Sequence, residues 1–449
     1  MAPLAPVVDA AAGPARPDPM TSRRSFLRRA AGGLVATSAL PSFGFTTERA
    51  GLAALADAAS RSAGAVSQEP FWDMVRAQFA LRPGLTLLNA ANLCPAPYVV
   101  SDAVTTLTRD IDADPSFQNR AKFSQLQESA ITALAGHMGA GPDTIVITRN
   151  TSESNNAVIN ALDLRAGDEV VIWDQNHPTN NVAWDVRAQR FGFTVRRITT
   201  PASPRSADEL THAFASALGP NTRVLAFSHV SNVSGVRRPA TALCAEARRR
   251  GVLSLVDGAQ SLGALVIDVG ALGCDFYTAS MHKWFMGPKE AGVLYVREGL
   301  ASTLWPTTVG VGWDGAKDRG ARRFGTLGQR DDATIAAVDR TVAFHRAIGA
   351  ARIEARVLEL ASLLKERLHA RIPDVVMHTP QDRALSAGVV IFGVPGLEPR
   401  PAYEMLYAHH GIACASAGGG FNGLRLCPHI YNSEAELEGA VTAVAEASR

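Results

Sequence analysis

Between residues 144 and 296, short and continuously apolar runs alternate with longer segments whose apolar residues recur at helical spacing. Continuously apolar runs are typical of strands buried on both faces, and strands that alternate with helices form mostly parallel sheets. The pattern predicts strands at 144–148, 169–173, 194–198, 223–228, 252–256, 276–278 and 291–296. It predicts the intervening helices at 151–162, 181–191, 207–218 and 240–250. The expected fold class is therefore α/β, with a mostly parallel sheet flanked by helices.

The segments on either side of this region follow other patterns. Before it, the sequence predicts a strand at 85–88 and helices at 71–79, 101–110 and 123–138, with Ser101 and Ser124 as candidate caps. After it, the sequence predicts helices at 332–348, 351–372 and 434–448 and strands at 387–392 and 423–427. A chain of 449 residues is ample for two domains. We therefore predict an N-terminal segment at 59–100, a large domain at 101–310 and a small C-terminal α+β domain at 311–449.

Polar residues follow the ends of successive predicted strands. They occupy 149–156, 174–177, 229–232 and 257–260. The carboxyl ends of parallel strands meet at one edge of a sheet, and ligands bind there. A Ser or Asn ahead of a helix is more often a cap, so one such segment alone would indicate little. Together, the segments predict a binding crevice at this edge.

Lys283 lies among apolar residues, next to Trp284 and close to Met281 and Met286. The chain's lysines are few, namely Lys122, Lys283, Lys289, Lys317 and Lys365. Burial of an ammonium group lowers its pKa and makes the amine a nucleophile, as a Schiff-base lysine requires. The alternative is a surface lysine whose stem covers the tryptophan. That alternative is favoured for an isolated lysine, whereas the polar strand ends favour a reactive one.

Asp257 follows a predicted strand and precedes Gly258. Since the sequence places no second carboxylate near it, a metal site is disfavoured. A lone carboxylate with a nucleophilic lysine indicates pyridoxal 5'-phosphate (PLP) as the cofactor. Asp257 would keep the ring nitrogen protonated, and Lys283 would anchor the cofactor and act as base and acid at the substrate Cα.

A phosphate group requires hydroxyl groups and the N–H groups of a helix N-terminus. Thr151 and Ser152 begin a predicted helix and offer both, and Ser280 and His282 flank the lysine segment. His177 is a candidate to stack on the cofactor ring. Its alternative role is that of a loop histidine ahead of a proline.

The N-terminus carries a twin-arginine pattern at 22–27, followed by an apolar run at 30–40 that is too short to span a bilayer. We interpret residues 1–58 as a disordered start and an export signal, with Met1 or Met20 as the first residue and cleavage after Ala56 or Ala58. A chance arginine pair is the alternative. The twin-arginine machinery carries folded proteins, so it suits a chain that loads a cofactor before leaving. The expected location is the periplasm or the cell exterior, without a stable membrane anchor.

Charge and cysteine usage exclude some classes of function. A formal charge of +2 gives no reason to expect a nucleic-acid partner. The cysteines have neither a CxxC pair nor a histidine at metal-ligand spacing, and their number is odd. We expect buried structural thiols at Cys94, Cys244, Cys274, Cys414 and Cys427.

Five motifs, in this order, resemble the class V aminotransferase / cysteine desulfurase family of fold-type-I PLP-dependent enzymes, in its isopenicillin N epimerase-like branch. They lie at 151–156, 176–180, 229–235, 256–261 and 280–284, and the similarity extends from 85 to 438. The resemblance implies roles for Lys283, Asp257, His177, Thr151, Ser152, Ser280 and His282 as given above. It adds Gln260 and Asn232 near the ring hydroxyl and substrate, and Arg425 with Asn89 at the substrate α-carboxylate. It also implies a homodimer in which residues 310–313 cross to the partner.

The resemblance leaves the reaction open. Cysteine desulfurases carry a nucleophilic cysteine in a mobile loop, whereas Cys414 falls several residues early and in a predicted strand. We therefore favour aminotransferase or deaminating chemistry on an amino acid or a peptide-borne amino acid. C–S lyase and epimerase chemistry are the alternatives, and a non-catalytic protein is disfavoured because Lys283 and Asp257 are both present. Export suits the tailoring of a secreted product such as a siderophore, as in a similar periplasmic pyoverdine-modifying enzyme.

Overall fold

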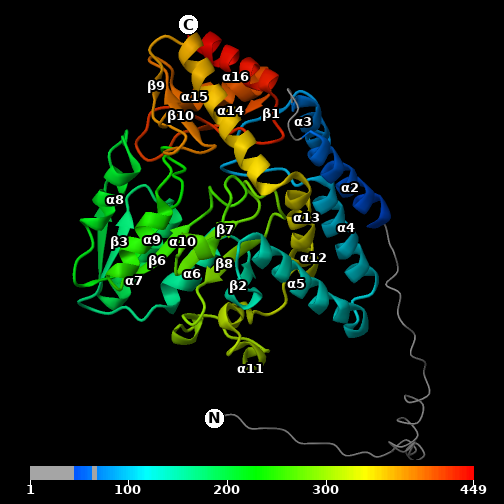
Figure 1. The fold of residues 1–449 in the computed structure, drawn as a ribbon, viewed down its shortest axis with the longest axis vertical. Helices are drawn as coiled ribbons and strands as arrows, with labels where there is room; N and C mark the ends of the chain where they lie inside the picture. Colours follow the sequence, from blue (N-terminus) through cyan, green and yellow to red (C-terminus); the bar gives the residue numbers. More distant parts are fainter. Residues whose placement is uncertain (1–44, 63–67, 449) are drawn as a thin grey trace, which may run out of the picture. The chain divides into compact units, whose positions relative to one another are not determined.

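The computed structural model describes residues 45–62 and 68–448, of which Glu48 onward forms one compact unit (Figure 1). The twin-arginine pattern and the candidate start Met20 lie outside the described residues. In the described part of the chain, no helix is both long and apolar enough to cross a membrane.

A seven-stranded sheet occupies the centre of this unit, with strand order β2-β8-β7-β6-β5-β3-β4. Its strands are β2 (Ile145–Thr148), β3 (Glu169–Trp173), β4 (Thr194–Ile198), β5 (Thr222–Ser228), β6 (Leu253–Asp257), β7 (Phe276–Ser280) and β8 (Gly292–Val296). Only β8 runs against its neighbours, since it pairs antiparallel with both β2 and β7. The predicted α/β class with a mostly parallel sheet is confirmed.

The antiparallel strand β8 brings the ends of β2 and β7 level with each other. Thr148 at the end of β2 and Ser280 at the end of β7 both pair with Gly292 of β8. A Cβ atom at Gly292 would lie only 2.7 Å from the Cα of Asn150. The loop after β2 therefore passes directly over β8, and this passage places the next helix beside the end of β7.

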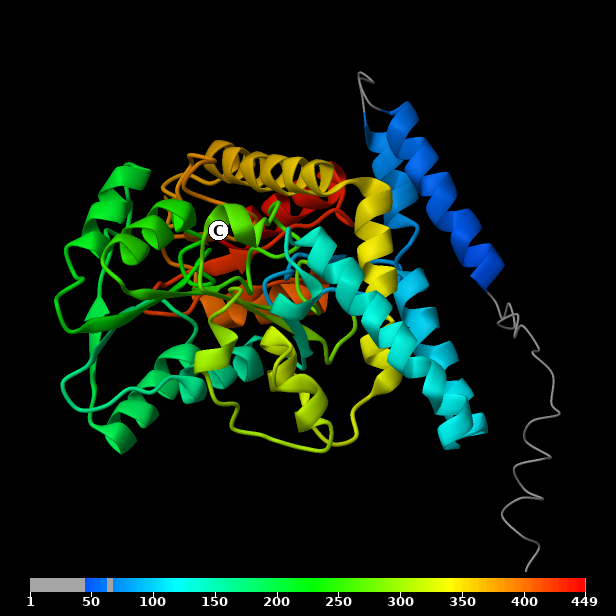
Figure 2. The same ribbon diagram turned by 60° about the horizontal axis from the view of Figure 1, so that its bottom comes forward.

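Helices cover both faces of this sheet (Figure 2). They are α6 (Thr151–Ala161), α7 (Pro178–Phe191), α8 (Ala207–Ala215), α9 (Ala240–Arg249) and α10 (Val269–Leu272). On β5, Leu225 and Phe227 join the hydrophobic core that contains Leu243 of α9. Val224 of the same strand joins the core that contains Trp184 of α7. Because successive side chains enter opposite cores, the strands are apolar at almost every position.

A smaller antiparallel sheet is built from the C-terminal part of the chain, in the order β12-β13-β10-β9. Its strands are β9 (Val376–Met377), β10 (Val390–Gly393), β12 (Ala415–Ser416) and β13 (Leu424–Leu426). Side chains of α14 (Ala350–Arg371), α15 (Pro399–His410) and α16 (Glu434–Ala447) share a hydrophobic core with it. The short strand β1 (Thr86–Leu87) pairs with β11 (Ile412–Ala413), so the start of the fold joins its end. The predicted boundary near residue 310 stays a prediction.

The remaining helices lie before β2 and after β8. They are α2 (Phe45–Arg61), α3 (Glu69–Arg76), α4 (Tyr98–Ala113), α5 (Phe117–His137), α11 (Trp313–Ala316), α12 (Asp332–Ala336) and α13 (Val338–Ile348). The helix predicted at 332–348 is thus two helices that meet at Ala337. The predicted caps were wrong: α4 begins after Pro97, and Ser116 caps α5 by accepting the N–H of Asn119.

The sequence did not predict helices α2, α10, α11 and α15. Helix α15 begins with prolines at 399 and 401, which the first turn of a helix tolerates because its N–H groups lack helical partners. Helix α2 falls in the range interpreted as a disordered start and signal. Its residues Leu55, Ala58 and Ala59 are buried in the main core, so ordered structure begins before residue 59.

Candidate active site

The carboxyl edge of the large sheet borders a cavity of about 270 Å³. Its lining residues come from the segments that follow β2, β3, β6 and β7, together with the loop after β1. They are Asn92, Asn150, Thr151, Ser152, Asn155, His177, Thr179, Asn180, Asp257, Ala259, Ser280, His282 and Lys283. Seven of the predicted site residues therefore meet in one place, as the strand-end argument requires.

Lys283 stands in the wall of this cavity, in the turn after β7. The neighbouring side chains of Met281, Trp284 and Phe285 are fully buried behind it. Burial lowers the pKa of Lys283, the negative charge of Asp257 partly offsets this effect, and the positive charge of Arg425 adds to it. The amine is therefore neutral, and so nucleophilic, at a lower pH than an ordinary lysine.

Asp257 is held in place by donors on both carboxylate oxygens. The amide nitrogen of Asn155 donates to Oδ2 at 2.9 Å, and the backbone N–H of Ala259 donates to Oδ1 at 3.0 Å. Asn155 is itself oriented, because the hydroxyl of Thr278 donates to its Oδ1 at 2.7 Å. The carboxylate, which is 3% exposed, thus has a fixed direction in the cavity wall.

The first turn of α6 and the end of β7 form one hydroxyl-rich corner of the cavity. The backbone N–H of Thr151 donates to the Ser280 hydroxyl at 2.8 Å, and the two hydroxyls lie 2.7 Å apart. Asn150 caps the helix by accepting the N–H of Glu153. A helix N-terminus with adjacent hydroxyls is a favourable site for a phosphate group.

Asn180 provides an independent sign that this cavity holds a polar ligand. Its side chain is 1% exposed and lines the cavity, yet neither amide atom has a hydrogen-bond partner among the described residues. Since buried polar groups are costly unless paired, the free amide requires a donor and an acceptor from elsewhere. A phosphorylated aromatic cofactor offers such groups. The residues present therefore fit PLP.

The two predicted histidines also line the cavity. His177 caps α7, and its Nδ1 accepts the backbone N–H of Thr179 at 3.3 Å. Burial lowers the pKa of His177, and the charge of Lys283 lowers it further. His282 contacts the backbone carbonyl of Lys289 through Nδ1 at 3.0 Å, and burial lowers its pKa as well. A lowered pKa favours the neutral imidazole, which at His177 suits the predicted contact with an aromatic ring.

Arg425, Asn89 and Asn232 form a second polar group outside the wall of this cavity. Arg425 of β13 donates to the Asn89 side chain at 3.2 Å and to the Asn232 backbone carbonyl at 3.4 Å. After burial, the positive charge of Arg425 is a further cause that lowers the pKa of both Lys283 and His177. The structure thus brings these three predicted residues together at the border of the cavity.

Gln260 lies elsewhere, behind the lysine turn. Its Oε1 accepts the indole N–H of Trp284 at 2.7 Å, and its Nε2 donates to the Ala91 carbonyl at 3.0 Å. The side chain is absent from the cavity wall described above. A direct contact with the cofactor ring therefore stays a prediction, while support of the lysine turn is evident.

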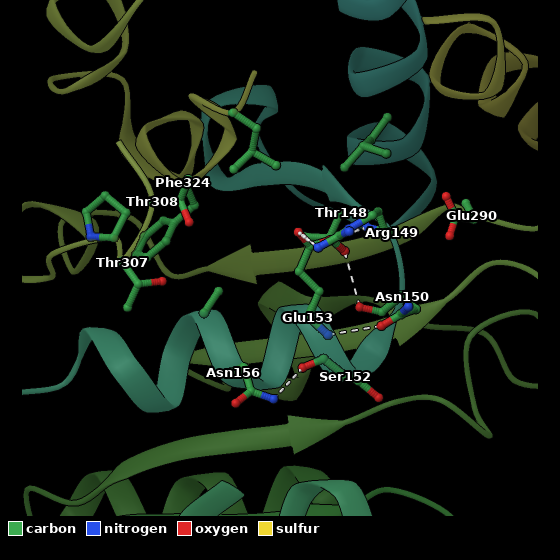
Figure 3. A pocket seen from close by; sticks show the side chains of 14 residues that line it. Thr148, Arg149, Asn150, Ser152, Glu153, Asn156, Glu290, Thr307, Thr308 and Phe324 are labelled. Atoms are coloured by element: carbon green, nitrogen blue, oxygen red, sulfur yellow. Dashed lines mark hydrogen bonds and ion pairs between the residues drawn. The ribbon is translucent and has the colours of Figure 1, made fainter. Parts of the chain in front are cut away.

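A larger pocket of about 480 Å³ lies beside the first turn of α6 (Figure 3). It shares Asn150 and Ser152 with the first cavity and extends past Arg149 and Glu153, an ion pair at 3.4 Å, to Thr307. It contains neither Lys283 nor Asp257. The smaller cavity, which contains both, is therefore the candidate reaction site.

Sequence reasoning missed several residues of the cavity. Asn155 and Asn180 both stand in motifs quoted above, but no role was assigned to them. The helical spacing between Thr151 and Asn155 is i, i+4, which places both on one face of α6 and so could have identified Asn155. No comparable local signal exists for Asn180.

The described residues contain no cluster of three or more metal-ligating side chains. The cysteines are free and buried, as expected. Burial raises the pKa of the Cys414 thiol to about 12, so at neutral pH it is not a thiolate.

Comparison with known proteins agrees with this geometry. The class V aminotransferase family model matches residues 87–439. An isopenicillin N epimerase of Amycolatopsis lactamdurans is 34% identical over 403 residues, which are 84% of this chain and 99% of that protein. A cysteine desulfurase of Salmonella choleraesuis (strain SC-B67) is 32% identical over 263 residues, which are 56% of this chain and 63% of that protein.

Solved structures show the same fold. A C-DES mutant with glycine covalently linked to the PLP cofactor has a TM-score of 0.76 at 27% identity and covers 83% of this chain and 99% of its own. A cysteine desulfurase from Thermococcus onnurineus NA1 has a TM-score of 0.75 at 27% identity. The match covers 83% of this chain and 97% of the desulfurase chain. Together with the fit of the cavity, these comparisons identify the cofactor as PLP and the fold as that of fold-type-I PLP enzymes.

Proposed function

The chain belongs to the class V aminotransferase family of PLP-dependent enzymes, and on that premise we propose that it acts at the Cα of an amino acid or of a peptide-borne amino acid. The proposed reaction is transamination or a related deamination. The observation that supports it most is the meeting of Lys283 and Asp257 in one cavity, with Arg425 at its border.

Each of these side chains has a role in such a reaction. PLP, when bound, supplies an electron sink for negative charge that develops at Cα. Lys283 holds the cofactor and moves the Cα proton, and its lowered pKa favours the neutral amine that can take up that proton. Asp257, fixed by Asn155 and Ala259, keeps a proton on the ring nitrogen. Arg425, braced by Asn89, binds the substrate carboxylate.

The test is a screen of the purified holoprotein against amino acids and short peptides, by absorbance and then by mass spectrometry of the products. Transamination predicts a keto acid product and conversion of the cofactor to its amine form, reversed by an added keto acid. The proposal fails if no amino acid or peptide changes the absorbance while PLP is bound.

Epimerisation is the second candidate function. It is favoured by the 34% identity to an isopenicillin N epimerase along 99% of that protein's length. Both reactions begin with removal of the Cα proton, so the residues above serve either one. Chiral analysis in deuterated water distinguishes epimerisation from transamination. An epimerase inverts the configuration at Cα without forming a keto acid, and solvent deuterium appears at Cα of both epimers.

C–S lyase or desulfurase chemistry is a further alternative within the family. A desulfurase requires a thiolate that reaches the substrate, whereas Cys414 is 8% exposed and its pKa is raised to about 12. Release of sulfide or formation of a protein persulfide from cysteine would favour this alternative over the proposal.

We also propose that the protein is exported by the twin-arginine machinery to the periplasm or the cell exterior. The support is the sequence at 22–27 and the short apolar run after it. Cleavage after Ala56 or Ala58 would cut helix α2 and remove buried Leu55, so a site before α2 is favoured over those positions. Tailoring of a secreted metabolite such as a siderophore would follow from export. Mass spectrometry of the N-terminus of protein from each cell fraction tests location and cleavage together.

We propose a homodimer in which the 305–313 loop contacts the partner. The loop exposes large apolar side chains: Trp305 is 69% exposed, Val309 55% and Val311 103%. Its residues Pro306, Thr307 and Thr308 line the larger pocket, which shares Ser152 with the reaction cavity. A partner bound there would approach the phosphate corner. Sedimentation of the wild type and of a Val311→Asp variant tests this: the wild type should be a dimer, and the variant should dissociate more readily.

A further inference from the structure

The turn that carries Lys283 has a front that faces the cavity and a back that is buried in the protein. Met281, Trp284, Phe285 and Met286 on the back are all 0% exposed. The turn closes through hydrogen bonds from the Met286 N–H to the Lys283 carbonyl at 2.8 Å and from the Gly287 N–H to the Met281 carbonyl at 2.7 Å. Met286 has a φ of 53°, a conformation that costs free energy for a residue other than glycine. Such a turn keeps its shape only when its surroundings hold it.

Two histidines hold the carbonyl groups that directly follow Lys283. His429 Nε2 lies 2.8 Å from the Trp284 carbonyl oxygen, and His345 Nε2 lies 2.9 Å from the Phe285 carbonyl oxygen. A carbonyl oxygen only accepts hydrogen bonds, so each Nε2 must carry a proton. His429 Nδ1 in turn accepts the Ile430 N–H at 2.7 Å, which fixes this imidazole as the neutral Nε2–H form.

Each histidine also packs against the ring of the residue whose carbonyl it binds. The imidazole of His345 stacks on the Phe285 ring with centroids 4.3 Å apart. The imidazole of His429 lies 5.3 Å from the Trp284 ring. Both histidines are at most 1% exposed, so neither contact is shared with solvent. Main chain and side chain of both residues are therefore fixed by the same partners.

The peptide bond between Trp284 and Phe285 has little room to move. Gly263 packs against it so closely that a Cβ atom there would lie 2.5 Å from the Trp284 carbonyl oxygen and from the Phe285 nitrogen. The indole of Trp284 is bound to Gln260 on its other side. Loss of a histidine donor would therefore leave a buried carbonyl unpaired rather than allow a new partner.

The two histidines come from different parts of the chain. His345 lies on α13, whereas His429 follows β13, the strand that carries Arg425. The bond from His429 to Trp284 thus joins the segment of the carboxylate-binding arginine to the segment of the cofactor lysine. The ring contact between His429 and Trp284 joins the same two segments.

We propose that His345 and His429 are positioning residues, which place Lys283 for the cofactor through the Trp284 and Phe285 carbonyl groups. His429 also sets the distance between Lys283 and Arg425. The inference requires bound PLP but does not depend on which of the reactions proposed above takes place.

The test compares Leu and Gln variants at both positions in the PLP-loaded protein. Leucine removes the donor, whereas the amide of glutamine reaches about as far as Nε2 and keeps it. We expect His345→Leu and His429→Leu to lose cofactor roughly tenfold faster on dilution, the scale expected when a buried carbonyl is left unpaired. The pH midpoint of the cofactor's visible absorbance should shift in the same variants. The Gln variants should lose cofactor at a rate close to that of the wild type, and their pH midpoint should also be close to the wild-type value.

His137→Leu is the matched control. His137 contacts the rings of Phe285 and His345, but no hydrogen bond joins it to either carbonyl. We expect this variant to keep the cofactor and the pH midpoint of the wild type. If His137→Leu changes both as much as His345→Leu does, general packing explains the effect and the proposal is wrong.

A kinetic comparison separates the two histidines. His429→Leu should raise KM for the substrate as well as lower kcat, because it disturbs Arg425, whereas His345→Leu should lower kcat with little change in KM. Asn variants replace the Leu variants if these do not fold, since the shorter amide of Asn does not reach the carbonyl. The proposal is overturned if the Leu or Asn variants retain cofactor as the wild type does. A protein that binds PLP but turns over no amino acid would refute the proposed function and leave the absorbance tests unaffected.

Discussion

Lys283 and Lys365 are both lysines whose pKa is lowered by burial, and they do different things. Lys365 on α14 is 1% exposed, and its Nζ donates to the Pro380 carbonyl at 2.8 Å, the Gln381 carbonyl at 3.1 Å and the Ser386 hydroxyl at 3.0 Å. The Nζ of Lys283 faces a cavity, and within residues 45–62 and 68–448 no group accepts a hydrogen bond from it. Burial lowers the pKa of both lysines.

The difference shows that a lowered pKa does not by itself make a nucleophile. All three N–H bonds of the Lys365 ammonium group donate to acceptors within the protein. The group therefore stabilises the fold and has no room to contact a substrate. Lys283 borders a cavity, and the charges of Asp257 and Arg425 act on its pKa in opposite directions. The reactive lysine is the one whose surroundings leave its nitrogen free.

Removal of each lysine in turn should have the largest effect on the two sites. We expect Lys283→Ala to abolish the cofactor's visible absorbance band and to lower activity by ~10³-fold or more, as removal of a covalent catalytic group does. Lys365→Met serves as the control and should keep the band. A band that persists unchanged in Lys283→Ala would show that another group holds the cofactor.

Removal of Arg425 tests the charged group at the border of the Lys283 site. Because hydrogen bonds to charged groups contribute ~1.5–3 kcal/mol, Arg425→Ala should weaken amino-acid binding by roughly 10–100-fold. Asn89→Ala should have a smaller effect in the same direction, since Asn89 only braces the guanidinium. Titration of the absorbance with amino acid measures both, and Arg149→Ala in the larger pocket is the control. If Arg425→Ala binds the amino acid as tightly as the control does, Arg425 does not contact the substrate.

Asn155 tests whether the direction of the Asp257 carboxylate matters. Asn155→Ala removes the donor to Oδ2, and we expect kcat to fall by about tenfold, the scale of one buried hydrogen bond to a charged group. PLP content should stay near that of the wild type. Asn160→Ala is the control, because Asn160 lies on the same helix and binds Arg187 instead. A wild-type kcat in Asn155→Ala would mean that Ala259 alone suffices.

Lys365→Met should affect stability rather than chemistry. The change leaves the Pro380 and Gln381 carbonyl groups without their donor, so we expect a loss of ~1–3 kcal/mol in the free energy of unfolding. Chemical denaturation measures this loss. An equally stable variant would show that the buried hydrogen bonds of Lys365 contribute little.

The stability difference between wild type and Lys365→Met should also depend on pH. The folded pKa of Lys365 is lowered from 10.5 to about 8 by burial. Between these values the unfolded chain binds more protons at this lysine than the folded chain does, so its contribution to stability rises with pH. The wild type should therefore gain stability relative to the variant as pH increases from 8 towards 10. A constant difference across this range would contradict the lowered pKa.

The smallest effect is expected at Cys414. Its thiol is buried, and its raised pKa keeps it protonated at neutral pH. Cys414→Ala should therefore leave the rate of the proposed reaction unchanged. If the wild type forms alanine from cysteine and the Cys414→Ala variant does not, the result supports desulfurase chemistry and contradicts the proposed reaction.

The sequence was sufficient for the sheet and for the residues at its carboxyl edge. Apolar periodicity is a local property, and it located every strand from β2 to β8. Thr151, His177, Asp257 and Lys283 directly follow or border strand ends, so the topology alone brings them together. The resemblance of Arg425 to a family position was needed because it comes from the distant strand β13.

What the sequence could not show are contacts between segments far apart in the chain. The bond from Asn155 to Asp257 and the bond from His429 to Trp284 depend on how helices and loops pack, which no local pattern encodes. Helix α2 was assigned to a signal because the candidate cleavage positions, Ala56 and Ala58, lie within it. The burial of Leu55, Ala58 and Ala59 in the main core shows instead that it belongs to the fold.

We expect Lys283, and not another of the chain's lysines, to hold the cofactor. The most direct measurement is borohydride reduction of the PLP-loaded protein, followed by proteolysis and mass spectrometry of the lysine-containing peptides. We expect a phosphopyridoxyl group on Lys283 and an unmodified Lys365. A stoichiometric adduct on Lys365 or Lys289, with Lys283 unmodified, would contradict it.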